Sequence, residues 1–423
     1  MSVRSTSNQA AGAAAARLSD AVAVAQARLN EEATTYGELD PVGPVRLSET
    51  LAAYVAGRAR EVNETASAAL EGELVIVSAV DPSLASALAD AAAVTLADRN
   101  QWAVVRADAR LAADENALAE QLMSAAIEGI ARVEFSRQML GADAAPEGDD
   151  WTPAMLGRAL LEATRALGGG RFNVHGDTTD GALQALGAAV QAIISAREAL
   201  DGRLMLVLHG VDELARGGRS RFADGAGALW QLRGLWQQAH GAALLSGGPA
   251  AAVMATDERQ AFYGYGQLHE AKDLSEWEVR RVLGQVLQEH SIVTTDGVAE
   301  AARLVGQALW LAPGLRARLS GEAQGPSAVR AAFERLVEER EVEHHQLLRA
   351  LTRVHRLALP VLTALAKGTG PYASTGRERL RPADVSRALL ALEDNGAVHR
   401  LGHGAWRLAD PTLAAMLRGT GAR

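Results

Sequence analysis

Short apolar segments alternate with helical segments over the first part of this 423-residue chain, from about residue 47 to residue 245. Strands that are joined through helices pair in parallel and are buried on both faces, so they consist of nearly continuous apolar residues. Four segments have this composition: Leu74–Val77, Trp102–Arg106, Leu204–Leu208 and Ala242–Leu245. The sequence therefore predicts an α/β fold built on a parallel sheet.

The composition is that of a folded protein, with 48% hydrophobic and 22% charged residues. It excludes a wholly disordered chain. The 42 basic and 51 acidic residues give a net charge of −9, which is too small to indicate a polyanion-binding surface over the whole molecule. Only Lys272 and Lys367 are lysines, and the remaining 40 basic residues are arginines. This Ala- and Arg-rich usage suggests a bacterial coding sequence.

The chain contains no cysteine, which excludes disulfides, thiolate nucleophiles and Cys-based zinc sites. The long uncharged stretch Gly234–Thr256 includes Gln237, Gln238 and His240 and is broken at Pro249. It therefore lacks the apolar length of a membrane span. We expect a cytoplasmic protein with no membrane partner.

Composition and periodicity divide the chain into four parts. An amphipathic helix is predicted in an N-terminal arm, strands are expected to stop after about Tyr265, and helical patterns follow. The predicted parts are the arm (1–45), an α/β core (46–268), a helical region (269–343) and a small C-terminal domain (344–423).

The turn after the first predicted strand is the position at which P-loop proteins bind phosphate. Such a loop needs glycines, so that backbone N–H groups can converge on the phosphates, and a lysine that neutralises their charge. The segment from Ser78 to Ser86 has neither, and its Asp81 would repel a triphosphate. The segment thus lacks the chemistry of a phosphate cradle.

The order of strands and helices, with a later apolar strand that ends in acidic residues, resembles AAA+ and STAND-type P-loop ATPases over most of residues 46–423. The resemblance implies an AAA+-like sheet core, a helical lid and a C-terminal winged-helix domain. In a gap-free alignment the family's loop glycines fall on Ala79, Pro82 and Leu84, its lysine on Ala85 and its Ser/Thr on Ser86. Of these five positions, only Ser86 keeps the family's residue type.

A second motif shows the same loss. The segment Leu206–Leu214 is similar to the Walker B strand of NACHT-like ATPases, in which an aspartate that orders Mg²⁺ stands at the position of His209. Histidine lacks the hard oxygen ligand that suits magnesium. Asp212 and Glu213 match a second acidic pair of some of these families, and Ser246 occupies the position of a γ-phosphate sensor. With both motifs degenerate, the resemblance implies a pseudo-ATPase that uses no cofactor and no metal.

The C-terminal part predicts one helix over residues 345–366, a second that starts at Pro382 and ends near Asn395, and a hairpin that turns at residues 401–404. This order resembles the winged-helix tail of archaeal-type and STAND-like ATPases. Residues 344–423 include 12 basic and 5 acidic residues, a net charge of +7 that leaves −16 for the rest of the chain. A basic module on an acidic body indicates DNA as a partner.

In a winged helix that binds DNA, Arg387 would face base edges in the major groove, and the neighbouring basic residues would approach phosphates. The predicted DNA-contacting residues are Arg377, Arg379, Arg381, Arg387, Arg400, His403 and Arg407. His344 and His345 lack further ligands at a suitable spacing, so we expect both at the surface rather than at a metal site.

The leading interpretation is a catalytically inactive AAA+/STAND-like protein that serves as a DNA-binding or scaffold subunit of a bacterial multi-protein complex. Its protein partner would be an active ATPase or another subunit of that complex. Two alternatives stay open. One is an ATPase that binds nucleotide through an altered loop and uses Asp212 and Glu213, and the other is an adaptor whose winged helix binds protein.

Overall fold

The computed structural model describes residues 55, 57–71, 74–100, 102–140, 179–199, 203–215, 222, 224–239, 242–288, 293–319, 324–372, 381–402 and 404–419. They divide into two compact units, one over residues 59–271 and one over residues 272–419 together with the segment up to Arg58. The predicted N-terminal arm (1–45) lies outside the described residues, as do Arg377, Arg379 and His403.

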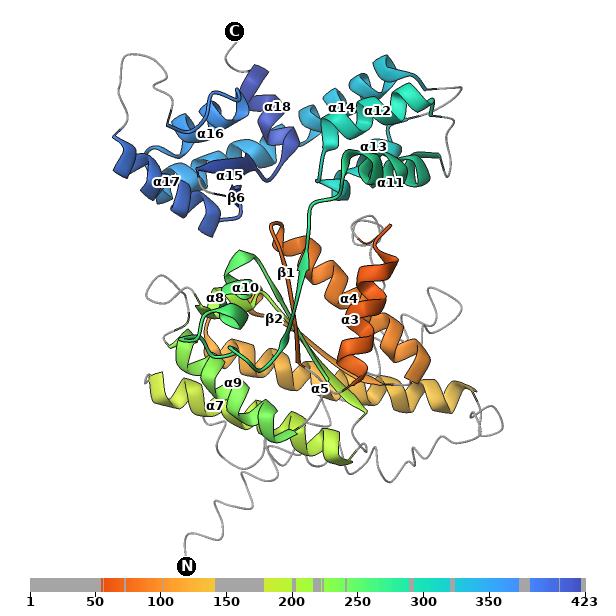
Figure 1. The fold of residues 1–423 in the computed structure, drawn as a ribbon, viewed down its shortest axis with the longest axis vertical. Helices are drawn as coiled ribbons and strands as arrows, with labels where there is room; N and C mark the ends of the chain where they lie inside the picture. The colour runs from red at the N-terminus through yellow and green to blue at the C-terminus, as the bar shows by residue number, and fades with distance from the viewer. Residues whose placement is uncertain are drawn as a thin grey trace, which may run out of the picture. The chain divides into compact units, whose positions relative to one another are not determined.

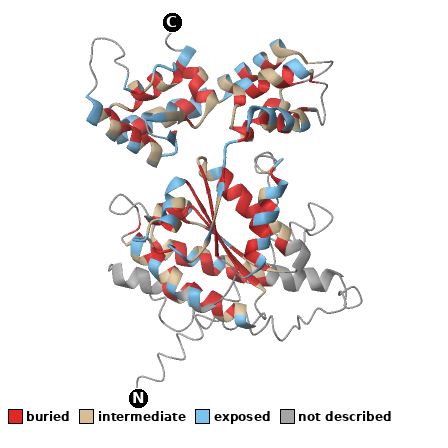
Figure 2. Ribbon diagram, in the orientation of Figure 1, coloured by how far each residue is buried: buried red, intermediate tan, exposed pale blue. Residues whose placement is uncertain are grey.

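The first unit contains a five-stranded sheet in the order β2-β3-β4-β1-β5, and all of its strand pairs are parallel. The strands are β1 (Leu74–Ala79), β2 (Ala103–Asp108), β3 (Leu204–His209), β4 (Ala243–Gly247) and β5 (Gln267–Ala271). Every residue of β1, β3 and β4 is buried (Figure 2), as expected for central strands that are covered on both faces. The predicted α/β fold class is confirmed.

Helices flank both sides of this sheet (Figure 1). In chain order they are α3 (Ala59–Leu70), α4 (Pro82–Asn100), the 3₁₀ segment η1 (Ala109–Leu111), α5 (Glu115–Leu140), α7 (Thr179–Ala199), α8 (Val211–Ala215), α9 (Gly225–Ala239) and α10 (Pro249–Thr256). Their apolar side chains and the strands form one core. Trp236, Leu118 and Ile76 are among its largest fully buried side chains.

Strand β5 corrects the expectation that strands stop after about Tyr265. It is an edge strand that pairs with β1, with His269 opposite Val77. Its sequence Gln-Leu-His-Glu-Ala is largely polar, and only Ala271 is buried. Edge strands carry polar and charged side chains because one of their sides lacks a neighbouring strand, so β5 has no apolar run by which it could be predicted.

The described residues of the second unit form helices, one antiparallel hairpin and an isolated bridge between Val293 and Gln324. Its first part comprises α11 (Glu276–Gln288), α12 (Thr295–Val305), η3 (Leu309–Leu311), α13 (Ala312–Arg316) and α14 (Pro326–Glu339). Its second part comprises α15 (Glu341–Val354), α16 (Ala358–Ala366), α17 (Pro382–Asp394), the antiparallel strands β6 (Val398–Gly402) and β7 (Ala405–Leu408), and α18 (Pro411–Gly419). Each part has its own apolar core.

Two expectations about the second part are wrong. The helix predicted over residues 345–366 is interrupted between Val354 and Ala358, and Pro360 lies in the first turn of the new helix α16, where proline is tolerated. His344 is buried, with 1% of its surface exposed, and its Nε2 lies 2.9 Å from Thr412 Oγ1. It is a core histidine with a polar partner, whereas His345 is exposed as expected.

Candidate functional site

Only two residues, Val80 and Asp81, connect β1 to α4, because β1 extends through Ala79 and α4 begins at Pro82. Asp81 Oδ1 accepts a hydrogen bond from the backbone N–H of Ser83 at 2.9 Å. The carbonyl of Asp81 accepts a second one from the N–H of Leu84 at 3.0 Å. Asp81 thereby caps the start of α4, and it satisfies N–H groups that a phosphate would otherwise bind.

The residues aligned with the family's phosphate loop lie in regular secondary structure. Ala79 is the last residue of β1, and Pro82, Leu84, Ala85 and Ser86 all lie in the first turns of α4. All of them except Pro82 are buried. The segment therefore does not form an open loop with convergent N–H groups.

The strand register brings polar residues from three strands into one row at the carboxyl edge of the sheet. Asp108 of β2 lies opposite His209 of β3, and His209 lies opposite Ser246 of β4. His209 Nδ1 is 2.7 Å from Ser246 Oγ, and its Nε2 is 2.9 Å from Oδ1 of Asp90 on α4. His209 and Ser246 have no exposed surface, and Asp90 is 1% exposed.

Asp90 is held as a carboxylate by two partners. Arg106 of β2 donates two hydrogen bonds to it, from Nε at 2.8 Å and from Nη2 at 2.9 Å. Burial opposes ionisation, but the hydrogen bonds and charges of His209 and Arg106 lower the pKa of Asp90 to about 2. Because an ionised carboxylate only accepts hydrogen bonds, Nε2 of His209 must donate to Asp90.

Ser246, His209 and Asp90 thus form a hydroxyl–imidazole–carboxylate chain, the same chemical order that serine hydrolases use. A hydrolase must expose its hydroxyl to substrate, but Ser246 and His209 are fully enclosed. The arrangement therefore serves to pair buried polar groups with one another, as a protein interior requires.

Arg110 in η1 supplies a further cation at this edge. Its Nη2 lies 2.7 Å from Asp108 Oδ2 and donates to Ser86 Oγ at 3.1 Å. Ser86 Oγ lies 3.2 Å from Ser246 Oγ, so Arg110 and His209 belong to one connected network. Burial disfavours the charged guanidinium, but Asp108, Asp212 and Asp81 together raise the pKa of Arg110.

The backbone leaves room for these charged side chains at two glycines. Gly210 has a φ of 66°, and a Cβ at this position would lie 2.5 Å from Cγ of Arg110. Only glycine combines this φ with so close an approach. Gly247 leaves room for Asp212, because a Cβ there would lie 2.6 Å from the Asp212 Oδ1. Asp212 is buried, whereas Glu213 is half-buried.

Sequence reasoning identified Ser86, His209, Ser246 and Asp212 at this edge but missed Asp90, Arg106, Asp108 and Arg110. A signal was present for Asp90, which is the only charged residue in the segment Leu84–Leu96 of an otherwise apolar, buried helix. Isolated charges in such surroundings are almost always paired.

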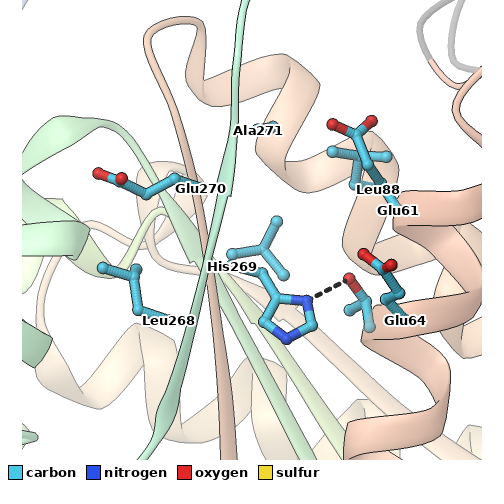
Figure 3. Close-up of a pocket in the computed structure, with 9 residues that line it drawn as sticks. Glu61, Glu64, Leu88, Leu268, His269, Glu270 and Ala271 are labelled. Carbon is cyan, nitrogen blue, oxygen red and sulfur yellow. Dashed lines mark hydrogen bonds between the residues drawn. The ribbon is translucent and has the colours of Figure 1, made fainter.

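A pocket of about 230 Å³ lies between α3 and β5 (Figure 3). Glu61, Glu64 and Glu270 are among its lining residues, together with His269, whose Nδ1 lies 3.1 Å from Thr65 Oγ1. The three carboxylates give the pocket a negative lining. This lining is unsuited to a nucleotide phosphate.

Four of the predicted DNA-contacting residues lie in the described part of the second unit: Arg381, Arg387, Arg400 and Arg407. Arg381 is exposed at the N-cap of α17. Arg387 is exposed on the same helix and forms an ion pair with Asp384, one turn earlier, at 2.5 Å.

The other two arginines lie on the hairpin. Arg400 of β6 has its guanidinium carbon 5.9 Å from the ring centre of Trp406. Arg407 of β7 pairs with Asp273 at 2.7 Å. The four arginines therefore lie at α17 and on the hairpin. Two of them, Arg387 and Arg407, form ion pairs with carboxylates of the same unit.

Within the described ranges, no three His, Asp or Glu side chains are grouped so that they could hold a metal ion. None of the helices in those ranges is long and apolar enough to cross a membrane.

No protein-family model and no curated protein sequence matches the chain. Among solved structures, a Walker-type ATPase of Pyrococcus abyssi is similar, with 14% identity over 85% of this chain and 95% of that chain and a TM-score of 0.57. The ADP form of Aeropyrum pernix ORC2 covers 88% of this chain and 94% of its own, at 12% identity and a TM-score of 0.41. Aeropyrum pernix ORC1, solved in complex with DNA, covers 90% and 96%, at 14% identity and a TM-score of 0.42. The likeness to the Pyrococcus protein shows that this chain shares the fold of that Walker-type ATPase.

Proposed function

We propose that this chain is a catalytically inactive AAA+/STAND-like protein, with degenerate Walker A and Walker B motifs, that acts as a DNA-binding or scaffold subunit of a bacterial multi-protein complex. In this proposal, residues 1–45 form an arm, 46–268 the degenerate core, 269–343 the lid and 344–423 a winged-helix domain. An active ATPase or another subunit would be the protein partner.

The observation that carries the inactive assignment is the closed polar network at the carboxyl edge of the sheet. Ser86, His209 and Ser246 are the residues aligned with the family's metal- and phosphate-binding positions, and they bind one another and Arg110. An internal guanidinium thus provides the positive charge that a metal ion or a loop lysine would provide in an active site. The two-residue connection from β1 to α4 further supports the assignment, since it leaves no loop to surround a phosphate.

The test is the binding of ATP and ADP to the purified protein with Mg²⁺, measured by calorimetry and by thermal shift. A ligand that binds the folded state raises the melting temperature by mass action. We expect no heat and no shift at millimolar nucleotide. Clear binding would overturn the inactive assignment and favour an ATPase that uses Asp212 and Glu213.

The DNA-binding part of the proposal is supported by charge and by element order. Three helices, α15 to α17, precede a two-stranded hairpin, as in a winged helix, and residues 344–423 have a net charge of +7. Arg381, at the N-cap of α17, and Arg387, on α17 itself, are both exposed, and α17 would be the recognition helix. The ion pair of Arg387 with Asp384 is a surface pair of small worth, so a phosphate or a base can replace the carboxylate.

The second test is retention of duplex DNA by the full chain and by a variant with Arg379→Gln, Arg381→Gln and Arg387→Gln. We expect the variant to lose retention at moderate salt. Unchanged binding would exclude these residues as the contact surface. Partner binding that is independent of salt, with no DNA affinity at all, would instead favour the protein-binding adaptor, because phosphate contacts weaken steeply as salt rises.

A further inference from the structure

Helix α15 and the connection that follows it carry arginines outside the predicted set of DNA-contacting residues. Arg349 and Arg353 lie in α15, and Arg356 lies in the short connection to α16. All three are exposed. We call these three residues the α15 ridge.

The ridge arginines differ from Arg387 and Arg407 of the predicted recognition surface, which are paired with carboxylates. In the part of the second unit that the structure describes, no carboxylate lies within ion-pair distance of any ridge arginine. By contrast, Arg387 and Arg407 are paired with Asp384 and Asp273. A phosphate that binds the ridge displaces no internal partner.

The acidic residues of α15 do not cancel the ridge. Glu341 and Glu343 lie in the first turn of the helix. Glu343 lies 3.3 Å from Arg340, and Glu341 lies 3.5 Å from His345. The positive charge therefore concentrates at the carboxyl end of α15.

The geometry of the ridge suits a linear polyanion. Residues four apart lie on one face of a helix, so Arg349 and Arg353 are neighbours, separated by a rise of about 6 Å. One DNA strand presents a phosphate about every 3.4 Å along the axis, so both arginines can reach the same strand. The exposed Gln346 and Thr352 lie beside them, and both residue types commonly bind phosphate.

An acidic protein is a weaker match for the same surface. The cores of protein interfaces are depleted of charges and enriched in aromatic residues. The exposed face of α15 from His345 to Arg353 has no Phe, Tyr or Trp. We propose that the α15 ridge is a backbone-contact surface for double-stranded DNA, separate from α17 and the hairpin. This inference rests on the proposed DNA-binding function and specifies where its affinity arises.

The experiment compares the full-length protein with the triple variant Arg349→Gln, Arg353→Gln and Arg356→Gln. Binding to a labelled random-sequence duplex is followed by fluorescence anisotropy over a series of salt concentrations. Loss of three phosphate contacts should weaken binding to every duplex sequence. It should also make the slope of log K against log salt shallower by about 3, since each contact contributes about 0.9.

The matched control removes the same charge elsewhere, with Arg259→Gln, Arg280→Gln and Arg335→Gln, three exposed positions outside α15 to α18. We expect the control to retain the wild-type affinity and slope. If the control variant weakens DNA binding as much as the ridge variant does, the loss of affinity follows from net charge alone. The proposal that the ridge contacts DNA would then be wrong.

The remaining outcomes are also decisive. If the wild type binds DNA and the ridge variant binds it equally well, the ridge is not a DNA-contact surface, while the proposed DNA-binding function stands. If the wild type does not bind DNA at low salt, the proposed DNA-binding function itself fails. Equally tight binding of poly-glutamate at matched charge would assign the ridge to acidic protein instead.

Arginines near a helix C-terminus also stabilise the helix through its dipole, so the melting temperatures of all variants are measured alongside. A lysine variant, Arg349→Lys, Arg353→Lys and Arg356→Lys, retains the charge. It should recover DNA binding if the ridge contacts phosphates. Failure of the lysine variant to recover binding, with the fold intact, would count against the ridge.

Discussion

Arg110 is a cation surrounded by carboxylates, with Asp108 as its direct partner and Asp212 and Asp81 nearby. Without Arg110, these negative charges repel one another, and Ser86 Oγ loses the hydrogen bond that it accepts from the guanidinium. We expect Arg110→Gln to lower the free energy of unfolding by about 1–3 kcal/mol, the usual range for losing hydrogen bonds to a charged group. Urea unfolding at neutral pH measures it.

Arg60 on α3 is a suitable control, because it also pairs with a carboxylate, that of Glu64, but its side chain is 90% exposed. Exposed pairs contribute little to stability. Arg60→Gln should therefore leave the urea midpoint unchanged. Equal midpoints for the Arg60 and Arg110 variants would mean that Arg110 is no more than a surface residue.

Asp90 makes the stability of the first unit depend on acid pH. The pKa of Asp90 is about 2 in the folded protein, below the ordinary value of 3.8. The ionised carboxylate therefore stabilises the fold fully above pH 3.8, and this stabilisation is lost as the pH falls through the pKa of the folded state. The shift corresponds to about 2 kcal/mol. In urea unfolding, the stability gap between wild type and Asp90→Asn should narrow by about this amount between about pH 5 and about pH 2. Parallel stability curves would contradict the assignment.

The two-residue connection between β1 and α4 determines what substitutions in the segment aligned with the family's phosphate loop can achieve. Ala85 aligns with the family's lysine, but it is a fully buried residue of α4. Ala85→Lys should cost about 3 kcal/mol or more, because an ammonium group would be buried without a partner. It should also fail to create ATP binding. Ser83→Lys, at an exposed position of the same helix, should change stability by less than about 0.5 kcal/mol.

Circular dichroism during urea unfolding and calorimetry with Mg²⁺ and ATP test both variants. ATP binding by the Ala85 variant would mean that α4 begins later than Pro82 and that the segment forms a loop after all.

The helices and strands that could be predicted from the sequence are those marked by a pattern of apolar residues within their own segment. The central strands β1, β3 and β4 are apolar runs in the chain and buried runs in the fold. The polar edge strand β5 and the break between α15 and α16 lack such a pattern. The apolar spacing continues through residues 355–357, and only Pro360 indicates a new helix start.

The candidate site was only partly predictable for a different reason. His209 and Ser246 were recognised because they lie at the ends of predicted strands. Asp90 and Arg110 reach the same network from α4 and η1, at separations of 119 residues to His209 and 24 residues to Ser86. Only the strand register and the packing of α4 bring these groups together, and neither can be derived from one sequence.

At the scale of the whole molecule, the chain shares its fold with a Walker-type ATPase, and polar side chains at the carboxyl edge of its sheet hydrogen-bond one another. Fold likeness by itself does not transfer an activity. The net charge is distributed unevenly along the chain, with +7 in residues 344–423 and −16 in the rest. Any salt-sensitive partner of this protein should therefore be sought at the C-terminal part.

Assembly provides the last prediction. In a protein whose subunits assemble around bound nucleotide, Mg²⁺ and ATP shift the oligomeric state, because a ligand that binds one state better shifts the equilibrium toward it. Here Arg110, Ser86 and His209 belong to one hydrogen-bonded network, and under the proposed inactive assignment nucleotide has no site through which to act. We expect the sedimentation coefficient to be the same with and without millimolar Mg²⁺ and ATP at several protein concentrations. A nucleotide-dependent increase, absent in an otherwise folded Asp212→Asn variant, would instead mean that this edge of the sheet binds nucleotide and that the inactive assignment is wrong.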